Sequence, residues 1–324
     1  MRALQVVTLT GPSDLVVNDV PEPTPGPADV LVEVHRVGVA FPDLLLSRGE
    51  YQMKPEPPFS LGVDVAGTVV SAPDGSGFEP GERVAAVGGW GGAQERVAIP
   101  AEFTFALPDA LSYDEGAALP MNYLTAEFAL HERGGLRAGE TVLVHGAAGG
   151  LGTATIQVAK GMGARVIGVV SSEAKRQTAT DAGADEVVLL EGFKDAVKEA
   201  TGGAGVDLVA DIVGGPAFLD SLRCLRRQGR LIVLGFASGL GIPEVKVNRL
   251  LLTNTDVRGA AWGEFAMSTP GYMQEQWARL VPMIESGAVR PPVGRLYELE
   301  DFGQALVDMD ERRALGKLVV RVRD

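Results

Sequence analysis

The chain has 324 residues, 46% of them hydrophobic and 22% charged, and this length allows two globular domains with substantial cores. Its formal net charge of −13 argues against nucleic acid or an anionic membrane surface as a partner, because phosphate contacts need a basic surface. No apolar run is long enough to cross a bilayer, and the sequence opens without an apolar signal segment. The single cysteine, Cys224, excludes an intramolecular disulfide, so we expect a cytoplasmic protein with Cys224 buried in a helix.

Short apolar runs separated by turn residues fill the first hundred residues and predict a compact, mostly-β unit. The expected strands are 15–17, 30–34, 65–70, 83–87 and 96–99. From about residue 115 the pattern changes to alternating helices and strands. The strands expected there are 141–144, 165–170, 186–190, 206–212, 230–234 and 257–261.

These six later strands are continuously apolar, as in a parallel sheet that helices cover on both faces. They predict an α/β protein with a complete doubly wound, six-stranded nucleotide-binding sheet. Helices are expected at 272–287 and 301–310, and a last strand at 317–322 is assigned back to the first domain. We therefore expect one domain from 1–115 and 266–324, with the nucleotide-binding domain 116–265 inserted into it.

The turn after the strand at 141–144 is the most informative segment. It contains Ala147, Gly149 and Gly152 in the spacing of a dinucleotide-binding glycine motif, between a strand and a helix. Gly149 would allow a pyrophosphate to approach the backbone, and Gly152 would allow the helix to pack close to its strand. The N–H groups of the helix start, at Gly150 and Leu151, would then hold the phosphates.

The end of the second strand indicates which dinucleotide binds. An NAD site needs a carboxylate here for the ribose 2′-hydroxyl, but this chain has Ser171 and Ser172, followed by Lys175 and Arg176. Hydroxyls and two cations suit a 2′-phosphate, so we expect NADPH. Alternatively, the two cations are solvated at a helix start, and Arg176 pairs with Glu173 one turn away.

Several further blocks are typical of one protein family. They are 21–30, 37–43, 48–51, 61–67, 146–152, 211–215 and 316–320. With them the chain resembles the medium-chain dehydrogenase/reductase superfamily, in its zinc-free quinone oxidoreductase branch. The resemblance implies a Rossmann domain inserted into a mostly-β, GroES-like catalytic domain.

The resemblance also bears on metal binding. Zinc-dependent relatives carry a cysteine in the block that matches Ala40, and a His-Glu pair where this chain has Val63 and Asp64. The histidines lie in unrelated segments, at His35, His131 and His145, so we expect no metal, and we expect His131 and His145 to be surface or packed residues. Without a Lewis acid for an alkoxide, acceptors that delocalise electrons are favoured: quinones or α,β-unsaturated carbonyls.

In this family the nicotinamide lies between the two domains, and the resemblance places four residues at the substrate cleft: Ala40, Phe41, Tyr51 and Tyr123. Tyr51 is the best available proton donor, because a phenol stays protonated at neutral pH. Alternatively Tyr51 packs on the ring while solvent supplies the proton. The family usually has Asn in place of Ala40 and a small residue in place of Tyr123, which leaves the substrate open.

The resemblance implies five further cofactor contacts: Thr125, Asp211, Phe236, Ser238 and Lys317. Each of three has an alternative role. Thr125 could bond its own helix, the segment at Asp211 could be a plain turn, and Lys317 could be an exposed strand-end lysine.

The expected function is therefore an NADPH-dependent reductase that transfers hydride to a quinone or another small conjugated electron acceptor. An enoyl-thioester reductase and a non-catalytic NADPH-binding sensor or structural protein are the alternatives. We also expect a homodimer that pairs through the sixth strand of the nucleotide sheet, since an unpaired apolar edge invites pairing with another chain.

Overall fold

The computed structural model describes residues 1–324, and their contacts divide the chain into two compact units. The first unit comprises Met1–Met121, Gly271–Trp277 and Pro291–Asp324, and the second comprises Asn122–Pro270 and Ala278–Arg290. The helix α10 Tyr272–Glu285 thus contributes its beginning to the first unit and its remainder to the second. The domain limits expected from the sequence, 1–115 with 266–324 and 116–265, differ from these units and remain a prediction.

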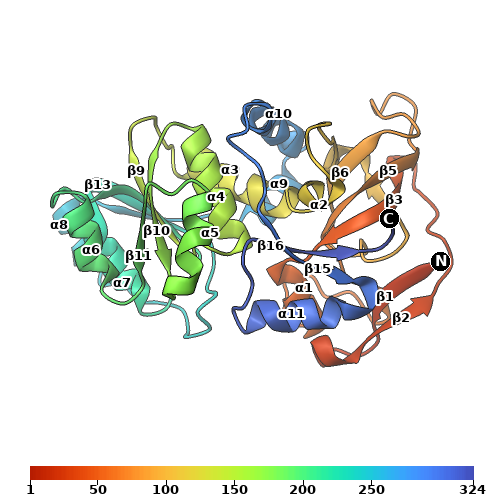
Figure 1. The fold of residues 1–324 in the computed structure, drawn as a ribbon, viewed down its shortest axis with the longest axis horizontal. Helices are drawn as coiled ribbons and strands as arrows, with labels where there is room; N and C mark the ends of the chain where they lie inside the picture. The colour runs from red at the N-terminus through yellow and green to blue at the C-terminus, as the bar shows by residue number, and fades with distance from the viewer. The chain divides into compact units, whose positions relative to one another are not determined.

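The second unit is built on a six-stranded parallel sheet (Figure 1). In spatial order its strands are β11 Glu186–Leu189, β10 Arg165–Val170, β9 Thr141–His145, β12 Val206–Asp211, β13 Leu225–Val233 and β14 Asp256–Gly259. The direction of winding reverses between β9 and β12, which is the topological switch point of a doubly wound sheet. The predicted fold class is confirmed.

Helices cover both faces of this sheet. The helices α4 Gly150–Gly161 and α5 Arg176–Asp181 contact each other and connect β9 to β10 and β10 to β11. On the return across the sheet, α6 Phe193–Ala200 and α7 Ala217–Cys224 contact each other beside β11, β12 and β13. Because such crossovers are right-handed, the two pairs lie on opposite faces. The other helical segments near this sheet are η3 Pro120–Leu124, α3 Thr125–Glu127, η4 Phe128–Arg133, η5 Glu173–Lys175, α8 Asn248–Thr253 and α9 Trp262–Ser268.

The first unit is mostly β, with two sheets (Figure 1). The smaller has the order β2 Leu15–Asp19, β1 Arg2–Val6 and β4 Phe59–Ser60. The larger has the order β15 Val293–Glu298, β16 Lys317–Arg321, β3 Asp29–Gly38, β5 Asp64–Ser71, β6 Arg83–Val87 and β8 Thr104–Ala106, and β7 Arg96–Pro100 pairs with β3. Its helical segments are η1 Pro12–Asp14, α1 Phe41–Ser47, η2 Ala101–Phe103, α2 Tyr113–Gly116, η6 Leu299–Asp301 and α11 Phe302–Asp310.

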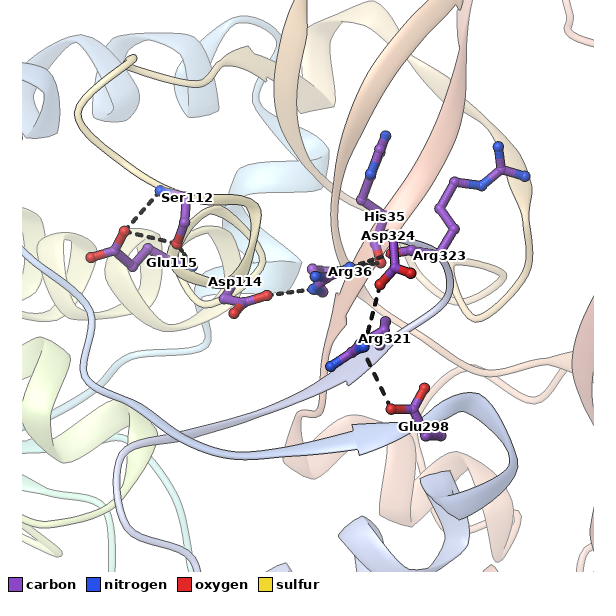
Figure 2. A network of polar contacts seen from close by, with 9 residues as sticks. All are labelled: His35, Arg36, Ser112, Asp114, Glu115, Glu298, Arg321, Arg323 and Asp324. Atoms are coloured by element: carbon purple, nitrogen blue, oxygen red, sulfur yellow. Dashed lines mark hydrogen bonds and ion pairs between the residues drawn. The ribbon is translucent and has the colours of Figure 1, made fainter.

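The last strand, β16, pairs antiparallel with β3, so its predicted return to the first unit is confirmed. A polar network fastens this end of the chain (Figure 2). Arg36 on β3 forms an ion pair with Asp114 and donates a hydrogen bond to the backbone oxygen of Arg323. Arg321 lies 3.7 Å from the Glu298 carboxylate on the neighbouring strand β15. Segments from both ends of the sequence are thereby joined into one sheet.

Two sequence expectations about elements need correction. The helical pattern around Cys224 ends at that residue, and β13 begins at Leu225 rather than at 230, because the segment from Leu225 pairs with β12. Four short strands that the sequence did not predict are β1, β4, β8 and β15. Cys224 itself is buried as expected, and burial raises the pKa of its thiol to about 12.

Candidate functional site

The turn between β9 and α4 is shaped by glycines. Gly146 has a φ of +63°, a conformation that L side chains rarely adopt. A Cβ atom on Gly152 would lie 2.1 Å from the carbonyl oxygen of Gly146, so any side chain there would collide with the turn. Gly152 thus allows the start of α4 to lie against the turn at Gly146, and its close packing on the strand stays a prediction. Ala147 is fully buried, and its N–H donates to the Val169 oxygen of β10.

The start of α4 can hold an anion. A Cβ atom on Gly149, the N-cap, would meet only the Gly146 oxygen at 3.5 Å, so this side of the turn is open. The next three residues, Gly150, Leu151 and Gly152, form the first turn of a twelve-residue helix. N–H groups in a first turn have no partner within the helix and lie at its positive end. This arrangement suits the pyrophosphate of a dinucleotide.

The end of β10 carries exposed hydroxyls and half-buried cations. Ser171 and Ser172 are exposed directly after the strand, and Lys175 is half-buried in η5. Arg176 lies 2.6 Å from the Glu173 carboxylate and also donates to the Val187 oxygen. The expected alternative, an ion pair between Arg176 and Glu173, is confirmed. Arg176 would have to give up this pairing to bind a phosphate fully, whereas the two serines face solvent.

The turns after β12 and β13 complete this edge of the sheet. Asp211 is buried, and its Oδ1 accepts hydrogen bonds from the N–H groups of Val213 at 3.0 Å and Gly214 at 2.8 Å. Ser238 is also buried, and its Oγ accepts the Leu240 N–H at 3.2 Å. Phe236 is 43% exposed, so it offers an apolar surface beyond the strand end. Asp211 and Ser238 therefore shape the turns, and Phe236 is the side chain available for contact.

The first unit contains a buried charged cluster. Lys317 Nζ lies 2.5 Å from Asp64 Oδ2, and both side chains are buried. Asp64 Oδ1 accepts the Met121 N–H at 2.8 Å. Burial raises the pKa of Asp64, and the Lys317 ammonium opposes that rise. The expected alternative of an exposed Lys317 is wrong, because its side chain is buried in the ion pair with Asp64.

A second buried carboxylate lies beside this cluster. Asp43 lies in the first turn of α1, where its Oδ2 accepts the Ala40 N–H at 2.9 Å and its Oδ1 accepts the Gly62 N–H at 2.8 Å. Burial raises the pKa of Asp43 to about 7, although both N–H bonds and the charge of Lys317 act in the opposite direction. Neither Asp43 nor Asp64 was predicted from the sequence as a site residue. The signal that could have found them is a lone aspartate inside an apolar block, in 41–46 and in 61–66.

The predicted cleft residues of the first unit lie around the start of α1. Ala40 is the N-cap and is 4% exposed, whereas Phe41 is 45% exposed. Tyr51 is half-buried against the apolar core of this unit. Burial raises the pKa of the Tyr51 phenol, and the negative charge of Asp43 raises it further. Tyr51 therefore keeps its proton at neutral pH and can donate a hydrogen bond.

The two remaining predicted positions lie in the helical segment before β9. Tyr123 is 1% exposed, and its hydroxyl donates to Gln157 Oε1 at 2.7 Å. Burial raises its pKa well above the ordinary value. Tyr123 is thus engaged in packing within the second unit, and we do not carry it into the proposed site. Thr125 is half-buried at the start of α3 and remains a predicted contact.

No group of three or more His, Cys, Asp or Glu side chains is placed to hold a metal ion. His131 is half-exposed beside Glu127, at 3.6 Å, and His145 is fully buried. None of the helices is both long and apolar enough to span a membrane.

A doubly wound sheet whose first strand feeds a glycine-rich turn and a helix defines a dinucleotide-binding fold. Family models match both parts of the chain: "Alcohol dehydrogenase GroES-like domain" at 26–109 and "Zinc-binding dehydrogenase" at 150–286. The bovine (Bos taurus) "Quinone oxidoreductase-like protein 2" is 35% identical over 313 residues, covering 95% of this chain and 89% of the relative.

Solved structures agree with these matches. A probable oxidoreductase from Mycobacterium abscessus superposes with a TM-score of 0.91 at 47% identity, covering 99% of this chain and 98% of that one. The quinone oxidoreductase from Thermus thermophilus, solved also in complex with NADPH, gives a TM-score of 0.85 at 34% identity, covering 99% and 100%. The chain belongs to the medium-chain dehydrogenase/reductase superfamily, in its quinone oxidoreductase branch. It is an oxidoreductase, as its sequence predicts.

Proposed function

We propose that this oxidoreductase uses NADPH to reduce a quinone or another conjugated carbonyl compound, and that it does so without a metal. The observation that carries the proposal is the pair of strand ends in the second unit. The end of β9 leads into the open start of α4, which glycines shape. The end of β10 is followed by two exposed hydroxyls and two half-buried cations, and no carboxylate precedes Glu173 there. Glu173 is itself paired with Arg176.

The chain's own residues divide the binding of the cofactor between them. The first turn of α4, at Gly150 to Gly152, would hold the pyrophosphate through backbone N–H groups. Ser171, Ser172 and Lys175 would hold the 2′-phosphate, with Arg176 contributing less because Glu173 and the Val187 oxygen already engage it. Bound NADPH supplies a hydride when an acceptor is present.

On the first unit, Phe41 and Tyr51 would contact the acceptor. Phe41 offers exposed apolar surface for a planar ring. The Tyr51 hydroxyl can donate a hydrogen bond to a carbonyl oxygen, since its raised pKa keeps the phenol protonated. Such a bond would orient the acceptor and stabilise the negative charge that develops on the oxygen.

The proposal of metal independence rests on the hydrogen bonds and the ion pair that the buried carboxylates already form. Asp64 binds Lys317 and the Met121 N–H, and Asp43 binds two backbone N–H groups. Neither belongs to a group of three or more His, Cys, Asp or Glu side chains that could hold a metal ion. A carboxylate saturated by cationic and N–H donors is a poor ligand for zinc, which needs three or four such groups.

The deciding experiment is stopped-flow oxidation of bound NADPH by a panel of quinones, enones and enoyl thioesters. We expect rapid oxidation with quinones or enones, in protein purified without added zinc and treated with chelator. Oxidation by enoyl thioesters alone would indicate the corresponding reductase instead. NADPH binding with no oxidation by any acceptor would indicate a sensor, and stoichiometric zinc with chelator-sensitive turnover would refute metal independence.

We also propose a homodimer formed through the second unit. The strand β14 is one of the two outer strands of the six-stranded sheet, as the sequence predicts. The helix α8 directly precedes it, with Leu251 and Leu252 74% and 73% exposed. An unpaired strand edge beside exposed leucines favours isologous pairing with a second copy of the chain.

A further inference from the structure

Two neighbouring strands of the nucleotide sheet each end in a buried polar side chain. Neither side chain has been given a contact with the cofactor or the acceptor in the function proposed above. His145 is the last residue of β9 and Asp211 is the last residue of β12. The strands pair in parallel with Val144 opposite Ala210, so the next residues, His145 and Asp211, emerge side by side. Both are fully buried, and His145 Nδ1 and Asp211 Oδ2 each have no hydrogen-bond partner.

A chain of hydrogen bonds fixes which nitrogen of His145 carries the proton. Ser221 Oγ lies 2.8 Å from His145 Nε2 and 2.8 Å from the Ala217 backbone oxygen. The carbonyl oxygen can only accept, so the single hydroxyl proton of Ser221 is used there. His145 must then donate from Nε2 to Ser221. In the neutral ring Nδ1 is therefore a bare acceptor, buried without a donor.

Asp211 also has a buried acceptor atom without a hydrogen-bond donor. Its Oδ1 accepts two backbone N–H groups, from Val213 and Gly214, whereas its Oδ2 accepts none. With a neutral His145 the pair presents two unsatisfied acceptors and one buried negative charge, which is costly. One added proton at Nδ1 would turn that nitrogen into a donor and place an imidazolium beside the carboxylate.

The groups around His145 determine the pKa of its ring. Burial lowers the pKa of His145, and the carboxylate of Asp211 raises it. Asp211 is the one charged group that acts on the ring; the other neighbours, Phe193 of α6 in edge-on contact and Ser221 of α7, are uncharged. The ring is thus poised to respond to a further charge placed nearby.

Such a charge would come from a dinucleotide. His145 immediately precedes the glycine-shaped turn at 146–149, and Asp211 holds the turn at 212–214. A dinucleotide on these strand ends brings its pyrophosphate charge to the glycine-shaped turn that follows His145, and nearby negative charge favours the protonated imidazole. We propose that the His145–Asp211 pair takes up one proton from solvent when NADPH binds to the second unit. The proton is bound at Nδ1 of His145, and no other bond is made or broken.

This inference rests on the proposed NADPH binding, and nitrogen NMR of the histidine rings tests it directly. The chain has three histidines, so ring nitrogen signals of the full-length protein are few. Without NADPH at pH 7.5 we expect His145 as a neutral ring protonated at Nε2. With saturating NADPH we expect both of its nitrogens to carry protons. His131→Gln and His35→Gln identify the His145 signals by elimination.

Titration calorimetry in two buffers of different ionisation enthalpy gives the number of protons taken up. We expect the wild-type protein to bind more protons per NADPH than His145→Gln, by a large part of one proton, and His131→Gln to match the wild type. Glutamine can still donate to Ser221, so the anchor to α7 is kept. The ratio of NADPH Kd values between His145→Gln and wild type should rise by about three- to tenfold from pH 8 to pH 6.5.

The outcomes separate the inference from the proposed function. A His145 ring that stays neutral while calorimetry shows NADPH bound overturns the proton uptake and leaves the function standing. No heat of NADPH binding at all overturns both. If His145→Gln does not fold, the NMR comparison of wild-type protein with and without NADPH still decides the matter.

Discussion

Lys317 Nζ and Asp64 Oδ2 lie 2.5 Å apart, and this buried ion pair joins two strands whose residues are 253 positions apart in the chain. Lys317 is the first residue of β16 and Asp64 the first of β5, and β3 lies between these strands. The second carboxylate oxygen of Asp64 accepts the Met121 N–H. The pair therefore links the chain's last strand to the end of the first continuous segment of the same unit.

Breaking this pair from one side should be severe. Lys317→Met keeps the aliphatic stem but leaves the Asp64 carboxylate buried without its cation. We expect a loss of about 3–5 kcal/mol in unfolding free energy, the usual cost of an uncompensated buried charge. Urea denaturation measures it. The double variant Lys317→Met with Asp64→Leu should recover part of the loss, and a double variant less stable than Lys317→Met would contradict this account.

Lys175→Ala tests the choice of cofactor. Losing one charged contact to the 2′-phosphate costs on the order of 1.5–3 kcal/mol, or roughly ten- to a hundredfold in affinity. The NADPH Kd should rise by that factor, while the NADH Kd barely changes. Arg176→Ala is the matched control, with a smaller expected loss, because Glu173 and the Val187 oxygen already bind Arg176. Equal losses for NADPH and NADH would refute the assignment.

Tyr51→Phe separates a proton donor from a packing residue. If Tyr51 donated the proton in the slow step, kcat would fall by about a hundredfold or more. We expect a fall of less than about tenfold, because a raised phenol pKa makes Tyr51 a weak acid at neutral pH and suits it to hydrogen bonding. Tyr51→Leu, which also removes the ring, should raise the acceptor KM further. Steady-state kinetics with one reactive quinone distinguish these cases.

Asp43 predicts how stability depends on pH. Its pKa in the folded protein is about 7, above that of an ordinary carboxyl, so the folded state holds this proton more tightly than the unfolded state. The unfolding free energy should therefore fall as pH rises from about 4 to 7, by at most roughly 1.4 kcal/mol per pH unit from this group. Asp43→Asn should have a flatter profile of urea midpoint against pH. The exposed control Asp74→Asn should keep the wild-type slope, and identical slopes in all three proteins would contradict the assignment.

The sequence predicted the nucleotide-binding sheet well, because its strands are continuous apolar runs with a glycine-rich turn after the first. It predicted the short strands of the first unit less well. The strand β15 Val293–Glu298 has three exposed residues and a single buried one, and neither an alternation nor an apolar run marks it. What holds β15 in place is its pairing with β16, a contact that local patterns do not contain.

In the candidate site too, features that depend on local sequence were predicted, and features that depend on distant contacts were not. The need for a glycine at position 152 was expected from a local motif, although the close contact that the structure shows is with the turn at Gly146. The roles of Lys317 and Tyr123 depend on partners far away in the chain, Asp64 and Gln157, so a single sequence could not reveal them. Asp43 was missed for a related reason: its partner N–H at Gly62 comes from another segment.

The assembly prediction can be tested by mass. A monomer has a mass of 34.0 kDa, so light scattering at micromolar concentration should give about twice that value for the proposed dimer. Leu251→Glu places a charge on the exposed face of α8, beside the outer strand β14, and should shift the mass toward the monomer because burying an unpaired charge is costly. Leu9→Glu, at an exposed apolar position of the first unit, should leave the mass unchanged.

NADPH affinity should change little in either variant. A wild-type mass near that of the monomer would rule out the dimer, and a dimer that withstands Leu251→Glu would move its interface away from α8.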